Sequence, residues 1–123
     1  MGKLLIAPCT TAVPLGKATL RVSGMIRNGG IYTGDYQIKV IPLFFANEKG
    51  RLSVAVSDDT LGKLMQGMPV NFNGTATTTG SGKTRAVNGI ATPSGKNEGS
   101  IRLWFTADGK KKGFASTYRF AEK

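Results

Sequence analysis

The sequence contains no histidine and one cysteine, and it has only seven acidic residues against 17 basic ones. Without histidine, the chain lacks the commonest general base and one of the commonest metal ligands of enzymes. Nearly all of its carboxylates fall at expected turns, helix caps or the chain end, where local structure explains them. Cys9, the single cysteine, has no partner for an internal disulfide. We therefore expect a protein that is not an enzyme and that holds no cofactor and no metal.

The sequence also has no long apolar run. No stretch approaches the roughly 20 residues that a membrane-spanning helix needs. Near the N-terminus, the apolar run Leu4–Ala7 is shorter than the core of a signal peptide, and Pro8 follows it. We therefore expect no signal peptide in this chain, and its location stays open: cytoplasmic, or exported if the N-terminus has been trimmed.

What the sequence does have is a strong positive charge on a chain of ordinary size. The 123 residues fit a single domain, which we place at residues 17–123, after an extended N-terminal segment at residues 1–16. A formal net charge of +10 is typical of proteins with an anionic partner, such as single-stranded nucleic acid or an acidic glycan. The charges are scattered, however, and only residues 110–112 form a basic run, so a generally basic surface without such a partner is the alternative.

Short segments of alternating apolar and polar residues recur along the chain, and this rhythm is typical of β-strands with one buried face. In the clearest segment, residues 18–27, Ile26 falls in the same apolar set as Leu20, whereas Met25 falls in the opposite set. Turn-forming residues separate this segment from the others. The further expected strands cover residues 36–45, 52–57, 70–76, 85–91, 101–106 and 114–120.

One short helix is expected among these strands, at residues 58–66. Ser57 is a suitable N-cap, and the acidic residues after it favour a helix N-terminus. Leu61 and Leu64 lie at helical spacing, and Gly67 is a typical residue to follow a helix.

Regularly spaced strands with one helix predict an all-β fold, namely a small antiparallel meander barrel of seven or eight strands with one short helix. An OB-type barrel with an extra hairpin is the first alternative, because the order of strands and helix between residues 18 and 91 matches that fold. A sandwich is the second alternative.

The segment Thr79–Thr84 ends like a phosphate-binding P-loop. A P-loop needs a strand before it and a helix after it, so that backbone N–H groups surround the phosphates. Here Thr77 stands where the first glycine of that motif belongs, and a strand is expected to follow. We therefore interpret the segment as a hairpin loop.

The OB-type alternative predicts a protein that binds single-stranded nucleic acid with a basic groove and aromatic platforms for the bases. Arg102 and Trp104 share one face of an expected strand, where an indole beside a cation suits a base and its phosphate. The candidate contact residues are Arg21, Arg27, Tyr32, Tyr36, Lys39, Arg85, Arg102, Trp104, Tyr118 and Arg119.

A third possibility is that the barrel interior holds a small apolar ligand, although the same residues also suit a packed core. The segment Ile41–Phe45 is apolar on both faces, which makes it a candidate subunit contact in a protein whose oligomeric state is open. The residues that suit an apolar interior are Leu43, Phe44, Phe45, Phe72, Leu103 and Phe105.

The sequence thus predicts a non-catalytic binding or structural β-domain with a basic surface. Its alternative function is OB-like binding of single-stranded nucleic acid.

Overall fold

The computed structural model describes residues 2–42 and 46–122. Within these ranges the chain forms ten strands and one helix. In chain order they are β1 (Lys3–Ile6), β2 (Cys9–Val13), β3 (Gly16–Val22), β4 (Met25–Asn28), β5 (Ile31–Ile41), β6 (Glu48–Ala55), α1 (Asp58–Met65), β7 (Val70–Thr78), β8 (Thr84–Pro93), β9 (Glu98–Ala107) and β10 (Lys110–Ala121).

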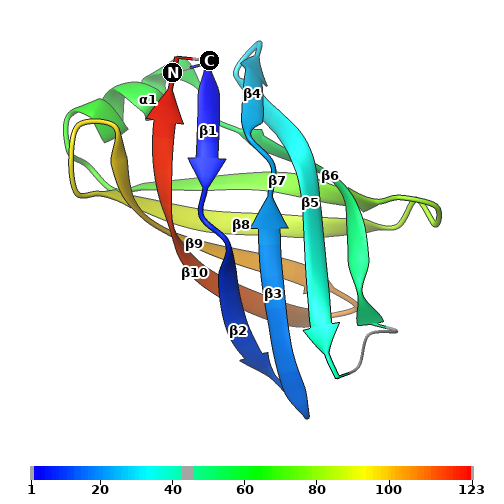
Figure 1. Cartoon of the computed structure of the whole chain (residues 1–123). Coiled ribbons are helices and arrows are strands. Elements are labelled where there is room, and N and C mark those ends of the chain that lie inside the picture. The colour runs from blue at the N-terminus through cyan, green and yellow to red at the C-terminus, as the bar shows by residue number, and fades with distance from the viewer. Residues whose placement is uncertain (1, 43–45, 123) are drawn as a thin grey trace.

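The strands form one closed antiparallel barrel (Figure 1). From β5 to β10 each strand pairs with the next one in the chain, and β10 pairs with β1, which closes the ring. Two positions in the ring are shared by consecutive segments, β1 with β2 and β3 with β4, so ten strands fill eight positions. The predicted meander barrel is confirmed, and its topology differs from the Greek-key order of an OB fold.

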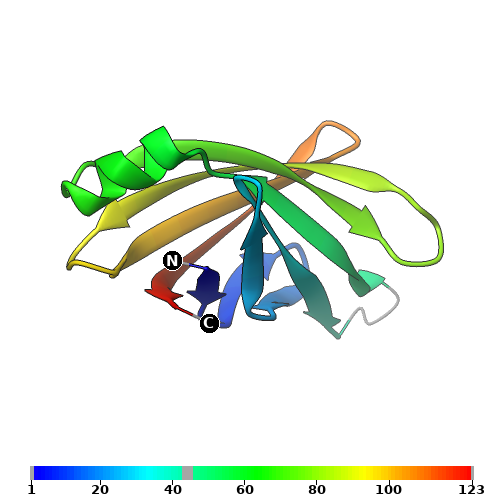
Figure 2. The same ribbon diagram turned by 90° about the horizontal axis from the view of Figure 1, so that it is seen from above.

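The barrel is flattened into two layers. In Figure 1, β3 and β5 run from top to bottom in front, whereas β7 and β8 cross behind them from side to side. Figure 2 shows the layer with α1, β7 and β8 above the layer with β1, β3 and β5. Apolar side chains fill the space between the layers, and the largest fully buried ones are Tyr32, Leu20, Met25, Ile38, Leu52, Leu103 and Val87.

A bulge at Ser23–Gly24 divides the strand that the sequence predicts over residues 18–27. Val22 pairs with Tyr36 and Ile26 with Thr33, so the β3–β4 side has one residue more than β5 between these pairs. The Ser23 hydroxyl oxygen accepts the backbone N–H of Asp35 at 2.8 Å.

This extra residue reverses the alternation beyond the bulge. Met25 is fully buried, whereas Ile26 is 52% exposed, so the predicted faces of these two residues are wrong. Period-two alternation fails here because one inserted residue exchanges the two faces of a strand.

The N-terminal residues belong to the barrel wall. Within the expected extended segment at residues 1–16, residues 3–6 form β1, which pairs on both sides, with β10 and with β4. Residues 9–13 of the same segment form β2 and pair with β3. Because Lys3 pairs with Ala121, both termini lie side by side at the end of the barrel that carries α1 (Figure 1).

The predicted helix is confirmed as α1. The Ser57 hydroxyl accepts the backbone N–H of Thr60 at 3.2 Å, as an N-cap does. Leu61 and Leu64 are buried against the barrel, and Gly67 follows the helix with a φ of +82°. The apolar face of α1 therefore covers one end of the barrel.

The β9–β10 turn consists of Asp108 and Gly109, both with positive φ, which is the geometry of a tight hairpin turn. The basic run at residues 110–112 therefore lies in β10. The P-loop-like segment forms the β7–β8 hairpin loop, and strand β8 follows it.

Candidate functional site

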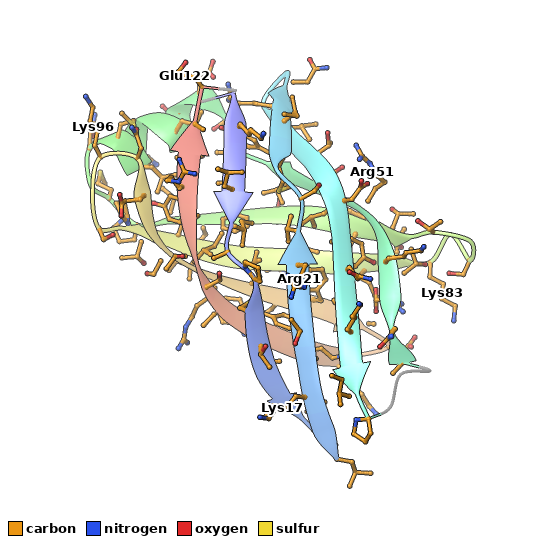
Figure 3. The ribbon with its side chains drawn as sticks, viewed as in Figure 1. Lys17, Arg21, Arg51, Lys83, Lys96 and Glu122 are labelled. Carbon is orange, nitrogen blue, oxygen red and sulfur yellow. The ribbon has the colours of Figure 1, made fainter. Side chains whose placement is uncertain are left out.

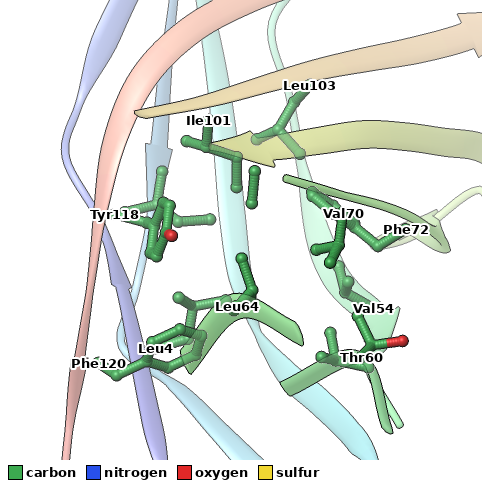
Figure 4. Close-up of a pocket in the computed structure, with 13 residues that line it drawn as sticks. Leu4, Val54, Thr60, Leu64, Val70, Phe72, Ile101, Leu103, Tyr118 and Phe120 are labelled. Carbon is green, nitrogen blue, oxygen red and sulfur yellow. The ribbon is translucent and has the colours of Figure 1, made fainter. Parts of the chain in front are cut away.

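The two ends of the barrel are closed to different degrees. At the helix end, α1 packs over the interior, and a cavity of about 20 Å³ remains beneath it (Figure 4). Its lining is almost entirely apolar and includes Leu64 of the helix, Val70 of β7 and Phe120 of β10. This volume suits about one water molecule. The helix end is therefore packed core.

The opposite end, which we call the mouth, is open. It holds a cavity of about 710 Å³, which lies within the roughly 300–1,000 Å³ typical of small-molecule pockets. Its apolar lining comes from β2 and the residue after it, from β5 and from β9. These apolar residues include Val13, Pro14, Ile38, Val40, Phe105 and Ala107.

Two charged residues of the mouth, Glu48 and Arg85, contact each other, and the buried Tyr36 contacts Glu48. The Tyr36 hydroxyl donates a hydrogen bond of 2.7 Å to Glu48 Oε2. Arg85 Nε lies 3.7 Å from Glu48 Oε1, and both side chains are about one-fifth exposed, at 19% and 20%. Burial, and then the neighbouring carboxylate, raises the pKa of Tyr36 well above its usual range, against a smaller opposing effect of Arg85. Tyr36 therefore keeps its proton and acts as a donor to Glu48.

The guanidinium of Arg85 is only weakly engaged. Its 3.7 Å contact with Glu48 is an ion pair but is longer than a hydrogen bond. Within residues 2–42 and 46–122, Arg85 donates no hydrogen bond, although it lines the mouth. Arginine can bind a carboxylate with two parallel N–H groups, and here those groups are available.

Lysine side chains add positive charge at the rim. Phe114 of β10 is buried, so Lys112 and Lys110, two and four residues before it, fall on the same inner side of the strand. Both line the mouth together with Lys111. Arg85 and three lysines thus line the same cavity as one carboxylate, Glu48, which favours an anionic ligand.

Of the predicted contact residues, Arg85 lines the mouth, and the buried Tyr36 hydrogen-bonds to Glu48, which also lines it. Arg27 lies at the helix end. It donates to the Val56 carbonyl at 2.8 Å and to Asp58 Oδ1 at 2.9 Å, and its guanidinium lies 5.8 Å from the centre of the Tyr32 ring. These contacts connect β4 to the start of α1.

Two predicted aromatic contacts are core residues at the helix end. Tyr32 is fully buried, and Tyr118 lines the small cavity there. Burial raises the pKa of both hydroxyl groups, and Arg27 opposes this effect at Tyr32.

The remaining predicted residues lie on two outer walls. Arg21 of β3 and Lys39 of β5 are exposed on one wall. On the other, Arg102 and Trp104 share the outer face of β9, as predicted, and Arg119 lies on β10 beside Glu98. Basic side chains also project from several other parts of the barrel, for example Lys17, Lys83 and Lys96 (Figure 3). The predicted contact residues do not form one continuous surface.

Three residues that line the mouth, Glu48, Lys110 and Lys112, are not among the contact residues predicted from the sequence. Polar residues near the end of a strand resemble a turn, and each of these three begins a strand or lies near its start. The available signal was strand phase: Leu52 faces inward, so Glu48, four residues before it, faces inward as well. Extending each strand to its turn in this way finds all three.

The predicted apolar interior is mainly packed core where the structure describes it. Leu103 and Phe105 are buried, and Phe72 packs against the core. Ile41, the first residue of the predicted subunit contact, is 67% exposed. Leu43, Phe44 and Phe45 lie outside the described residues.

No helix within the described ranges is long and apolar enough to cross a membrane. The same residues contain no group of three or more cysteine or acidic side chains placed to hold a metal ion. A comparison of the chain with protein-family models, curated proteins and solved structures finds no match. The functional argument therefore depends on the geometry of the chain itself.

Proposed function

We propose that this chain is a non-catalytic binding module that holds a small anionic ligand in the mouth of its barrel. One observation carries the proposal: a cavity of about 710 Å³ contains Arg85, whose guanidinium has no hydrogen-bonded partner among the described residues. The basic residues expected from the net charge thus include a set that surrounds a pocket.

The partly buried guanidinium of Arg85 is the physical reason to expect anion binding. Arg85 is 19% exposed, so its charge is screened less by water than that of a surface arginine. A hydrogen bond from such a group to an anion is stronger than one between neutral groups. Lys110 and Lys112 at the rim raise the local concentration of anions and speed their entry.

Binding of an anionic naphthalene sulfonate dye, anilinonaphthalene sulfonate, tests this proposal by fluorescence. We expect saturable binding at one site in the wild type. R85Q should weaken it by about tenfold or more, because one charge-assisted interaction of about 1.4 kcal/mol corresponds to tenfold in affinity. K110Q/K112Q should weaken it less and reduce its dependence on salt.

R102Q is the matched control, because it removes the same charge from the outer wall and leaves the mouth intact. Circular dichroism and thermal unfolding verify that each variant is folded, since this dye also binds partly unfolded chains. Equal loss of binding in R85Q and R102Q would contradict a site in the mouth.

Binding of single-stranded nucleic acid is a second candidate function, supported by the outer face of β9. A Cβ on Gly113 would lie 3.0 Å from Trp104 Nε1, so the indole lies over the bare backbone of β10. Beside Trp104 is a groove of about 330 Å³ lined in part by Asn73 and Asn88. Arg102 shares this face and suits a phosphate.

Titration of a labelled single-stranded oligonucleotide against salt tests the second candidate. Phosphate contacts predict a steep loss of affinity as salt increases, and stacking predicts that W104A loses roughly 1–3 kcal/mol of binding. Y118F, an aromatic change in the core, is the control. Absence of binding at low salt would exclude this function.

A further inference from the structure

The chemistry of the mouth defines its ligand more narrowly, and the inference here rests on the proposed function. The lining of the cavity combines apolar side chains, among them Val13, Val40 and Phe105, with the charged side chains of Glu48 and Arg85. A compact inorganic anion would use only the charged residues. A ligand that matches the whole lining has an anionic head and an apolar part.

The depth of the cavity limits the apolar part. Ile38 and Phe105 line the mouth and are themselves 2% and 4% exposed. Two residues deeper along the same strands, Tyr36 and Leu103 are buried in the packed core. An apolar chain can therefore lie in the mouth but cannot pass through the barrel, which favours a medium chain over a long one.

An anionic ligand would compete with Glu48 for the guanidinium of Arg85. Glu48 already occupies one side of Arg85, but at 3.7 Å and through Nε alone. Its other oxygen is held by the Tyr36 hydroxyl at 2.7 Å. A ligand carboxylate that engages two guanidinium N–H groups would interact more strongly than this long contact.

We propose that the mouth binds a medium-chain monocarboxylate, whose head replaces Glu48 as the main partner of Arg85 while its chain packs against Val40 and Phe105. Glu48 keeps its hydrogen bond to Tyr36 in the complex. The exchange leaves two carboxyl groups beside one guanidinium.

Two carboxylates in one partly buried site raise the pKa of one of them, so binding takes up a proton from solution. The titratable and charged groups around Glu48 influence how complete this uptake is. Tyr36 of β5 and Arg85 of β8 contact Glu48, and Lys110, Lys111 and Lys112 of β10 line the same cavity. Tyr36 can hydrogen-bond to either protonation state of Glu48, because its hydroxyl donates and accepts. The lysines lie at the rim, where water screens them, and we expect them to reduce the uptake without abolishing it.

Isothermal titration calorimetry with three matched ligands tests the ligand class. Decanoate has head and chain, acetate has the head alone, and decyltrimethylammonium has the chain with the opposite charge. We expect decanoate to bind with one-to-one stoichiometry, and the other two to bind at least about a hundredfold more weakly, a loss of about 2.7 kcal/mol. R85Q should weaken decanoate binding by about tenfold or more.

Repeating the decanoate titration in Bis-Tris and in Tris at pH 7 measures proton uptake, because these two amine buffers differ in ionisation enthalpy and neither is an anion that competes for Arg85. We expect the wild type to take up a substantial fraction of one proton. E48Q keeps an oxygen that accepts from Tyr36 but removes the competing charge, so it should bind decanoate several-fold more tightly and take up no proton. E98Q removes an exposed carboxylate on the outer wall and should behave like the wild type.

The outcomes separate the inference from the proposed function. If neither decanoate nor the naphthalene sulfonate depends on Arg85, the proposed function fails. If the dye requires Arg85 but decanoate binds no better than acetate, the site holds anions and the monocarboxylate assignment is wrong. If decanoate requires Arg85 without proton uptake, and E48Q binds it no more tightly, the exchange with Glu48 is wrong. The proton measurement uses the wild type, so it does not depend on the folding of any variant.

Discussion

The helix end and the mouth belong to the same closed ring of strands, yet one end is filled with apolar side chains and the other is open and charged. At the helix end, Leu61 and Leu64 bring apolar surface to an apolar interior, and about 20 Å³ stays empty. At the mouth, Glu48 and Arg85 bring charge to the opening, and about 710 Å³ stays accessible. Apolar burial contributes most of the stability of a fold, whereas partly dry charges bind partners. We therefore expect the helix end to contribute more to stability, and the mouth to carry the binding that we propose.

The largest expected effect is loss of the fold at high pH. Burial raises the pKa of all three tyrosines above the usual value of 10, at both ends of the barrel, and Glu48 adds to the effect at Tyr36. Because the unfolded chain then releases these protons first, stability is unaffected below about pH 10 and falls as pH rises above it. Ultraviolet absorbance of tyrosinate and circular dichroism should therefore change together, in one alkaline transition. A tyrosine that ionises near pH 10 while the ellipticity stays native would contradict the buried positions.

Shortening a side chain of α1 should give the next largest effect. Leu64 is 6% exposed and lines the small cavity, so L64A should lower the free energy of unfolding by about 2–5 kcal/mol. Val13 at the mouth is only half-buried, and V13A should cost less than about 1.5 kcal/mol. Urea denaturation followed by circular dichroism measures both. Equal costs would show that the mouth is packed as tightly as the helix end.

Removing one hydroxyl at each end gives a finer comparison. The Tyr36 hydroxyl donates to Glu48, and a hydrogen bond to a charged group contributes about 1.5–3 kcal/mol, so Y36F should destabilise the fold by about that amount. Tyr118 has no side-chain hydrogen bond to the rest of the described chain, and Y118F should change stability by less than about 0.5 kcal/mol. The same denaturation experiment decides between them. If Y118F destabilised the fold more than Y36F, the hydrogen bond from Tyr36 to Glu48 would not be the more important of the two hydroxyl interactions.

The smallest expected effect concerns the start of α1. S57A removes the N-cap oxygen that accepts from Thr60 and should lower the free energy of unfolding by about 1 kcal/mol. Because the change lies at the helix end, it should leave the affinity of the mouth for the naphthalene sulfonate unchanged. S53A, on the partly exposed outer face of β6, is the control for stability. Weaker dye binding by S57A would show that the two ends are coupled.

Local pattern was sufficient for the fold class, the helix and most strands. Alternation placed Tyr36, Ile38 and Val40 on one buried face, and the structure confirms it. In a strand that is buried on one side, the sequence itself shows which face points inward, because the inward residues are apolar over most of its length. The Ser57 cap and the two helix leucines mark α1 in the same local way.

The errors fall where the pattern depends on contacts far away in the sequence. The bulge at Ser23 is stabilised by the backbone of Asp35 on another strand, and nothing in residues 18–27 alone shows it. Three predicted binding residues, Arg27, Tyr32 and Tyr118, instead make structural contacts at the helix end. Polar residues at the end of a strand have the composition of a turn. Only the strand pairing shows that Glu48 and Lys112 belong to β6 and β10.

The pairing of Lys3 with Ala121 has a practical consequence for anyone who builds with this barrel. A peptide linker joined at residue 2 or at residue 122 would leave from the side of the molecule farthest from Arg85. The protein could then be immobilised on a chip, or fused to a reporter, in a single orientation that presents its opening to the solution. Residues 2 and 122 are also near enough in space for a short linker to join them and for new termini to be cut in the β7–β8 loop.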